Sequence, residues 1–125
     1  MNNYKNTKIV YQTLDKSYSI KLNTIKISSA NSLSHEIAKC VLALELLYSG
    51  KTILTECIFL NKKRADILAF GSNDNDITIY EVTHSEKEGG DGSKDLDYPF
   101  NIIYLSSEKI LNSKYLKSII EGKTK

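Results

Sequence analysis

The sequence predicts a mixed α/β fold in which helices flank the faces of a central sheet. Two observations lead to this prediction. Short runs rich in β-branched and aromatic residues, bounded by turn formers, have the length of strands, and two longer segments repeat apolar residues with a helical period. The two hairpin runs, residues 64–70 and 77–83, are largely apolar on both faces, as in strands that helices cover on both sides. With 125 residues, the chain is expected to form a single domain.

The first elements are expected to be strands followed by a long helix. N-terminal strands are expected within residues 1–30, because residues 8–27 alternate loosely between apolar and polar side chains. The polar run 28–32 then offers several N-caps for a helix from about Leu33 to Tyr48. That helix is apolar around most of its circumference and should be covered on several sides.

The rest of the chain predicts four further strands, a hairpin turn and a final helix. Strands are expected at residues 52–60, 64–70, 77–83 and 101–105, and an amphipathic helix at residues 106–121. Three glycines in four residues indicate an irregular loop between the third and fourth of these strands. The core of the domain is therefore expected at residues 31–105.

The hairpin formed by residues 64–70 and 77–83 carries two acidic side chains at the same height. A symmetrical closure of its six-residue turn predicts four facing pairs: Arg64–Thr83, Asp66–Glu81, Leu68–Ile79 and Phe70–Ile77. Directly opposed side chains share a face of the sheet, with Cβ atoms roughly 4.5–5.5 Å apart. Two carboxylates so placed repel each other, and a divalent cation is the usual counter-charge because hard cations bind carboxylate oxygens.

Other readings of these acids remain open. A register shift of one residue would place Asp66 and Glu81 on opposite faces of the sheet. The acids would also be structural if one of them lay at a sheet edge and paired with Arg64. Two further acids are candidates for the same site: Glu36, whose charge would otherwise only complement the dipole of the first helix, and Glu56 on the preceding strand.

The order of these acidic motifs resembles that of the PD-(D/E)XK, or restriction-endonuclease-like, nucleases. The resemblance covers roughly residues 32–105 and is carried by Glu36 on a glycine-ended helix, by Arg64-Ala65-Asp66-Ile67 and by Tyr80-Glu81-Val82. The small archaeal Holliday junction resolvases belong to this superfamily and are of similar length. The resemblance implies a restriction-endonuclease-like mixed central sheet and a DNA endonuclease activity, with branched DNA as a candidate substrate.

The resemblance also implies a metal site. Asp66, Glu81 and the backbone carbonyl of Val82 would bind Mg²⁺ or Mn²⁺, with Glu36 completing the shell directly or through water. The metal would activate water and offset charge on the phosphate. A catalytic lysine normally follows the glutamate by two residues, where this chain has Thr83.

Three basic residues are candidates for the role of the missing lysine. Lys94 precedes a Tyr-Pro pair, as migrated lysines do in divergent relatives, and is the favoured candidate. Arg64, which faces Thr83 in the proposed register, and Lys87 are the others. The alternative is a catalytically inactive protein of the same fold that binds nucleic acid or a protein partner. A small α/β interaction domain with structural acids is a third reading.

Composition limits the setting and the partners of the protein. The net charge of +2 is nearly neutral and gives no independent evidence for nucleic acid. Cys40 and Cys57 lie in apolar runs without metal-ligand spacing, which predicts buried thiols in a reducing compartment. No run is long and apolar enough for a membrane span, so a cytoplasmic protein is expected. By resemblance, a homodimer is expected, with the N-terminal strands or the last helix as its interface.

Overall fold

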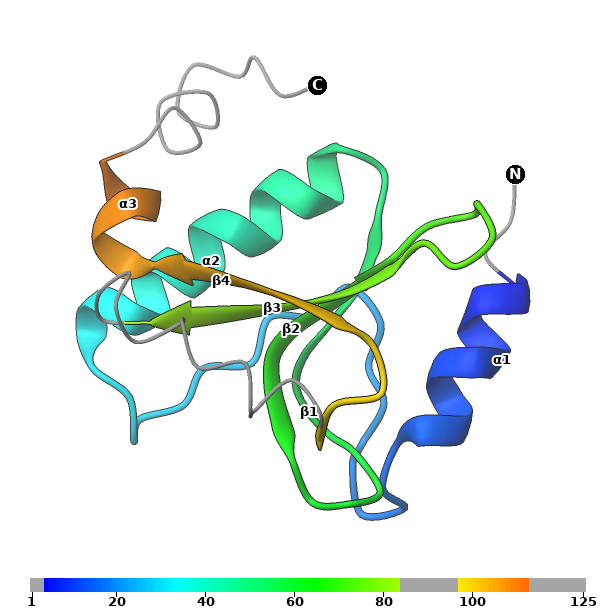
Figure 1. Ribbon diagram of the computed structural model, residues 1–125. Coiled ribbons are helices and arrows are strands. Elements are labelled where there is room, and N and C mark those ends of the chain that lie inside the picture. Colours follow the sequence, from blue (N-terminus) through cyan, green and yellow to red (C-terminus); the bar gives the residue numbers. More distant parts are fainter. Residues whose placement is uncertain (1–3, 84–96, 113–125) are drawn as a thin grey trace.

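Four strands build one mixed sheet with helices on both of its faces, as the computed structural model shows for residues 4–83 and 97–112 (Figure 1). The helices are α1 (Tyr4–Thr13), α2 (Leu33–Tyr48) and α3 (Ser107–Leu111), and the strands are β1 (Thr52–Ile58), β2 (Arg64–Phe70), β3 (Ile77–Thr83) and β4 (Asn101–Ser106). The strands lie in the order β1-β2-β3-β4. β3 and β4 are parallel, and the other neighbours are antiparallel. The predicted α/β class is confirmed.

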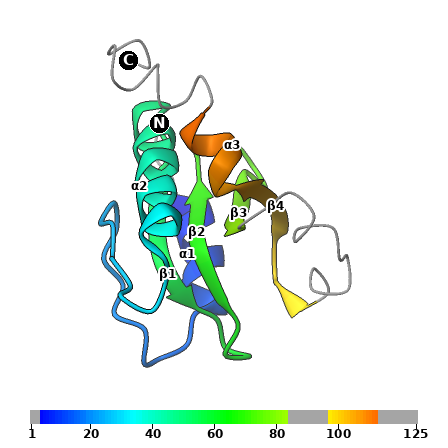
Figure 2. The ribbon, with the colours of Figure 1, turned by 90° about the vertical axis from the view of Figure 1, so that its left-hand side faces the viewer.

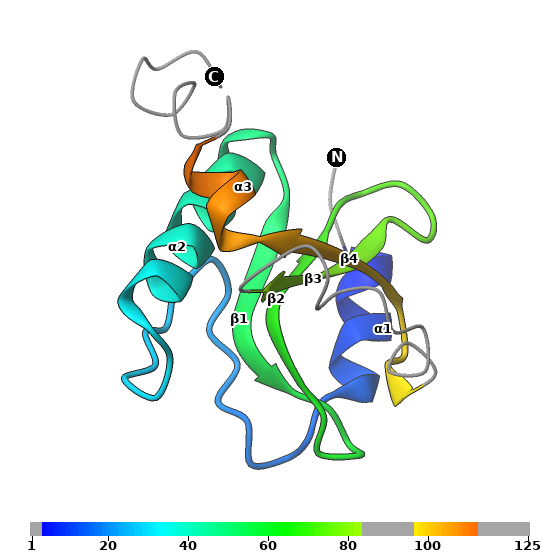
Figure 3. The ribbon, with the colours of Figure 1, turned by 60° about the vertical axis from the view of Figure 1, so that its left-hand side comes forward.

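The sheet separates two apolar clusters. On one face, α1 contributes Val10 to a cluster with Leu68 and Phe70 of β2. On the other face, α2 and α3 pack over Ile67 and Ala69 of the same strand. Figures 2 and 3 show α1 on one side of the strands and α2 with α3 on the other. The alternation of β2 between the two clusters explains why its sequence is apolar on both faces.

The predicted helix over residues 33–48 is confirmed, because its capping signals act as expected. The side chain of Ser32 accepts a hydrogen bond from the backbone N–H of His35 at 3.2 Å. At the other end, the N–H of Ser49 bonds back to the last turn, and Gly50 adopts a left-handed φ of 95°. Glycine reaches this conformation without steric cost, so it ends the helix and turns the chain into β1.

The expectation of strands within residues 1–30 is wrong, because the described residues 4–30 contain helix α1 and no strand. Residues 4–13 form α1, because Asn6, Val10 and Leu14 recur every four residues and all three are buried. Leu14 makes only an isolated bridge with Phe59. The loose alternation of apolar residues in this segment was therefore a misleading signal for strands.

The segment after α1 lies along the outer edge of β1 without forming a strand. The N–H of Asn23 donates to the carbonyl of Ile53 at 2.8 Å, and the side chain of Asn23 accepts from the N–H of Ile53 at 3.0 Å. Further along, the N–H of Lys26 donates to the hydroxyl of Thr55 at 2.8 Å. Side chains thus replace the regular backbone ladder, which period-two patterns cannot predict. This segment places Lys26 and Ser28 beside the start of α2.

Asn6 connects α1 to the turn of the hairpin, and its replacement by alanine is expected to cost about 1–3 kcal/mol of unfolding free energy. The buried side chain donates from Nδ2 to the carbonyls of Gly71 at 2.6 Å and Asn73 at 2.7 Å. Its loss leaves both carbonyls without this donor. Lys5→Ala is the matched control, because it removes only an exposed ion pair with Asp74 and should cost less than about 1 kcal/mol. Equal losses in urea unfolding would contradict this assignment.

The last predicted helix starts where the sequence places it. Ser106 caps α3 by accepting a hydrogen bond from the N–H of Lys109 at 3.1 Å. The expected continuation of this helix to residue 121 lies outside the described residues, as does the loop at 84–96. Among the described helices, none combines the length and the apolar character required to span a bilayer.

Candidate functional site

The β2–β3 ladder opens where the two acids face each other. The register runs through Phe70–Ile77, Leu68–Ile79 and Ile67–Tyr80, as the sequence predicts. At the next position the backbone N–H of Asp66 donates to Glu81 Oε1 at 3.1 Å, and the N–H of Val82 donates to Asp66 Oδ2 at 2.8 Å. Carboxylate oxygens therefore take the places of backbone carbonyls between the strands.

A third acid, Glu56, lies at the same height on β1. The pairs Thr55–Ile67 and Cys57–Ala65 place it opposite Asp66. Glu56 has a left-handed φ of 50°, which is uncommon for a residue with a side chain and interrupts the regular strand. Its side chain reaches α2, where Glu56 Oε2 lies 3.0 Å from Lys39 Nζ. Three neighbouring strands thus bring three acids to one level of the sheet.

The ammonium group of Lys39 lies between two of the acids, Glu36 and Glu56, and forms an ion pair with each. Its fully buried ammonium donates to Glu36 Oε1 at 2.7 Å, to Glu56 Oε2 at 3.0 Å and to the carbonyl of Lys26 at 2.7 Å. These contacts use all three of its N–H groups. Burial opposes the charge of Lys39, but the bonds to the two carboxylates outweigh it and raise its pKa.

Glu36 is surrounded by donors. Its Oε1 also accepts from the N–H of Ser28 at 2.8 Å, and its Oε2 accepts from Asn31 Nδ2 at 2.9 Å and contacts His35 Nδ1 at 2.8 Å. Although burial opposes its charge, these bonds and the bond from Lys39 lower the pKa of Glu36 to about 2. A metal ion at Glu36 would have to displace at least one of these donors.

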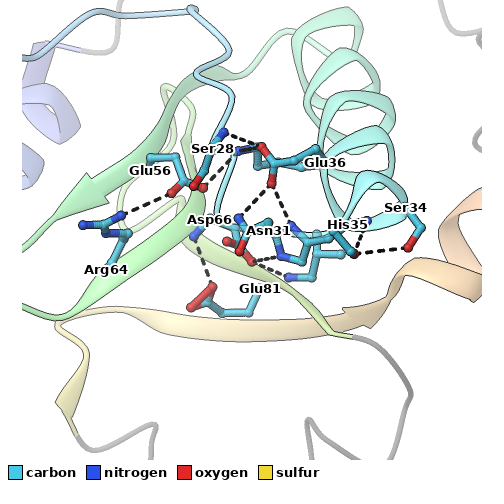
Figure 4. A network of polar contacts seen from close by, with 12 residues as sticks. Ser28, Asn31, Ser34, His35, Glu36, Glu56, Arg64, Asp66 and Glu81 are labelled. Carbon is cyan, nitrogen blue, oxygen red and sulfur yellow. Dashed lines mark hydrogen bonds and ion pairs between the residues drawn. The ribbon is translucent and has the colours of Figure 1, made fainter.

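His35 links Glu36 to the hairpin acids (Figure 4). Its Nδ1 faces Glu36 Oε2, and its Nε2 lies 3.4 Å from Asp66 Oδ2. Both ring nitrogens therefore face carboxylates, and the ring donates to both only when each nitrogen carries a hydrogen. This side chain fixes the position of Asp66 relative to the first turn of α2.

Among the acids of the site, Glu81 is the one whose negative charge is disfavoured by its surroundings. Burial raises its pKa, and the neighbouring charge of Asp66 raises it further, to about 8. Tyr98 donates its hydroxyl to Glu81 Oε2 at 3.0 Å, and the same hydroxyl lies 3.0 Å from the carbonyl of Arg64. Within residues 4–83 and 97–112, no basic side chain forms an ion pair with Glu81. A cation placed between Asp66 and Glu81 would relieve their repulsion.

The structure brings only some of the predicted site residues together. Asp66, Glu81 and Val82 meet directly, and Glu36 reaches them through His35. Arg64 is exposed and pairs with Glu56 Oε1 at 3.7 Å (Figure 4). The candidate lysines Lys87 and Lys94 lie outside the described residues.

Sequence reasoning missed Lys39 altogether. One signal was available, because Lys39 is the single lysine of a mostly apolar helix and follows Glu36 by three residues, on the same helix face. An unpaired lysine in that setting would be costly, so it predicts an acidic partner. The second partner, Glu56, could not be identified without the packing of α2 on β1.

The oxygen atoms that could bind a metal ion suit a hard cation, but they come from few residues. Asp66 and Glu81 offer carboxylate oxygens, and the carbonyl of Val82 points toward β2 as its N–H does, because both groups of a strand residue face the same neighbour. Oxygen ligands of this kind suit Mg²⁺ or Mn²⁺. In the described part of the chain, no three His, Cys, Asp or Glu side chains are arranged to hold a metal. Two further acids near the hairpin, Glu36 and Glu56, form ion pairs with Lys39.

No protein-family model, no curated protein and no solved structure matches this chain. The function must therefore be inferred from the geometry of the site itself.

Proposed function

We propose that this protein is a metal-dependent nuclease of restriction-endonuclease-like fold that hydrolyses phosphodiester bonds in DNA. The observation that supports this proposal best is the facing pair Asp66 and Glu81 in the opened hairpin. Burial and mutual repulsion raise the pKa of Glu81 to about 8, a cost that a bound cation would remove. Buried carboxylates with perturbed pKa values are typical of functional sites.

Two further features support the same proposal. The acid-bearing helix, the following strand and the hairpin lie in the order on which the nuclease resemblance depends. The two acids also face each other in the register that the resemblance requires. A structural pair of acids at this place would be expected to have a basic partner, as Glu36 and Glu56 do in Lys39.

Each residue of the site has a distinct part in the proposed reaction. A bound Mg²⁺ would lower the pKa of a coordinated water and polarise the phosphate. Asp66 and Glu81 would hold it together with the Val82 carbonyl. Tyr98 orients Glu81 through its hydroxyl, and His35 orients Asp66. These contacts outside the ligand shell fix the direction of the ligand oxygens.

A basic turn next to the site can supply affinity for DNA. Lys62 and Lys63 connect β1 to β2, and Arg64 begins β2, two residues before Asp66. All three side chains are exposed. Basic side chains of this kind bind backbone phosphates and position a nucleic acid without reading its sequence.

A catalytically inactive nucleic-acid- or protein-binding relative of the same fold is the second candidate. It is favoured by Thr83, which stands where the resemblance requires a lysine. Lys39 does not replace that lysine in the described geometry, because its three N–H groups are engaged by Glu36, Glu56 and the Lys26 carbonyl. Lys94, Arg64 and Lys87 are the remaining candidates for the role.

Mn²⁺ is expected to stabilise the wild-type protein but not the Asp66→Asn variant. A ligand that binds only the folded state adds about 2.7 kcal/mol when present at roughly one hundred times its Kd. Thermal unfolding with Mn²⁺ and with EDTA measures this shift. Asp74→Asn is the control, because it removes an acid from the exposed hairpin turn and should keep the full shift. Equal shifts in the wild type and Asp66→Asn would refute the metal site.

Incubation with Mg²⁺ and with branched, single-stranded or linear duplex DNA separates the two candidate functions. Cleavage by the wild type that is lost in Asp66→Asn supports the nuclease. Binding without cleavage, together with a normal Mn²⁺ shift, supports the inactive relative. If cleavage occurs, Lys94→Ala should abolish it while sparing the Mn²⁺ shift; retained cleavage would assign the basic role to Arg64.

A further inference from the structure

The outer side of α2 exposes a continuous row of uncharged, mostly apolar side chains. We call it the outer stripe; its members are Leu33, Ile37, Cys40, Leu44 and Tyr48. Leu33 is 77% exposed, Ile37 is 44% exposed and Tyr48 is 51% exposed, whereas Cys40 and Leu44 between them are half-buried. Figures 1 and 2 show α2 with the sheet on its inner side and α3 beside it, and no described element covers its outer side.

The stripe has the pattern of a helix-packing surface. Its members recur at intervals of four, three, four and four residues, which keeps them on one face along the whole helix. The charged residues Glu36 and Lys39 are buried and point into the fold. Glu45 is half-buried and lies about 100° around the helix from Leu44, beside the stripe and not within it. A helix that is apolar around its circumference is normally covered on all sides, and contiguous exposed apolar surface marks interaction sites.

The positions in the stripe match a second copy of the same helix in antiparallel orientation. Leu33 and Tyr48 are equidistant from a point between Cys40 and Val41, and so are Ile37 and Leu44. A two-fold axis at that point would place Leu33 against Tyr48 of the other copy and Ile37 against Leu44. One axis therefore pairs every large side chain of the stripe, as an isologous interface requires.

Electrostatics favours the same occupant. Antiparallel packing brings the positive N-terminal end of each helix dipole to the negative C-terminal end of the other. A nucleic acid would require lysine or arginine on this surface, and the stripe has neither. We propose that the outer stripe is a homodimer interface in which α2 packs antiparallel against α2 of a second copy. This interface is distinct from the two that the sequence suggested.

Sedimentation equilibrium without metal or DNA tests the interface independently of the proposed nuclease activity. At about 100 µM chain, where even a weak specific interface is occupied, we expect twice the chain mass of 14.1 kDa. Ile37→Glu should weaken the dimer at least about a hundredfold, because a charge would be buried without a partner in each copy. Leu33→Glu should also weaken the dimer. Because Leu33 is more exposed than Ile37, this substitution is expected to disturb the fold of the single chain less.

Leu60→Glu is the matched control, because Leu60 is 59% exposed but lies after β1, away from the stripe. Its mass should equal that of the wild type. A wild type that is monomeric at about 100 µM would overturn the proposal. Stripe variants that remain folded by circular dichroism and dimeric would also overturn it.

Cross-linking locates the axis. A short bismaleimide should join two chains through Cys40, because Cys40 lies beside the axis and Cys57 is fully buried. Ile37→Glu and Cys40→Ser should abolish the product. A cross-linked product that persists equally in Ile37→Glu would place the contact elsewhere.

Discussion

Replacement of Lys39 by methionine is expected to lower the free energy of unfolding by about 3–5 kcal/mol. The ammonium is fully buried and is the shared partner of Glu36 and Glu56. Methionine fills a similar volume but leaves both carboxylates without their cation. Breaking a buried ion pair in this way costs more than removing the whole pair. Urea unfolding at pH 7 measures the loss.

The matched control removes the two negative charges as well. A triple variant with Lys39→Met, Glu36→Gln and Glu56→Gln should recover much of the stability lost by Lys39→Met alone. If the triple variant is less stable than the single one, the hydrogen bonds of the carboxylates matter more than their charge. A loss below about 1 kcal/mol in Lys39→Met would contradict the buried network itself.

The parts of the fold that depend on local signals could be predicted from the sequence. Ser32 and Gly50 define both ends of α2 through capping chemistry that acts within one turn. The turn formers between Phe70 and Ile77 determine the hairpin register and so bring Asp66 to Glu81. Such features do not require knowledge of the rest of the chain.

The parts that depend on distant contacts could not be predicted. Asn6 is buried in α1 because it bonds to the hairpin turn some 65 residues later, so a polar residue occupies an inward position of the helix. Similarly, Lys39 meets Glu56 only because α2 packs on β1 and because Glu56 adopts a left-handed φ. The acids of the site were visible in the sequence, whereas the cation that neutralises two of them was not.

Replacement of Glu81 by glutamine is expected to stabilise the protein at alkaline pH while removing its response to Mn²⁺. In the folded protein the pKa of Glu81 is raised to about 8, whereas the unfolded chain keeps it near 4.5. Between these values the folded state holds one more proton than the unfolded state. The wild-type free energy of unfolding should therefore fall by about 1.4 kcal/mol per pH unit as the pH rises through this range.

Glutamine is neutral and still offers an oxygen to the N–H of Asp66, so the variant should lack this decline. The advantage over the wild type should be on the order of 2–4 kcal/mol at pH 9 in EDTA, and small at pH 4. With Mn²⁺ the difference in unfolding free energy between the variant and the wild type should shrink or change sign, because only the wild type keeps both carboxylate ligands. Urea unfolding across this pH range, with and without Mn²⁺, measures both effects.

Glu36→Gln is the control with the opposite sign. The pKa of Glu36 is lowered to about 2, so its charge stabilises the fold above pH 4.5 and this stabilisation is lost as the pH falls toward 2. Glu36→Gln should therefore destabilise the protein at pH 7 and pH 9, where Glu81→Gln stabilises it. Because the two substitutions are chemically identical and lie in one site, only their surroundings can produce opposite signs. If both substitutions changed the free energy of unfolding in the same direction at pH 9, the proposed electrostatics would be contradicted. In that case Glu36 would not be stabilised by Lys39, or Glu81 would not be repelled by Asp66.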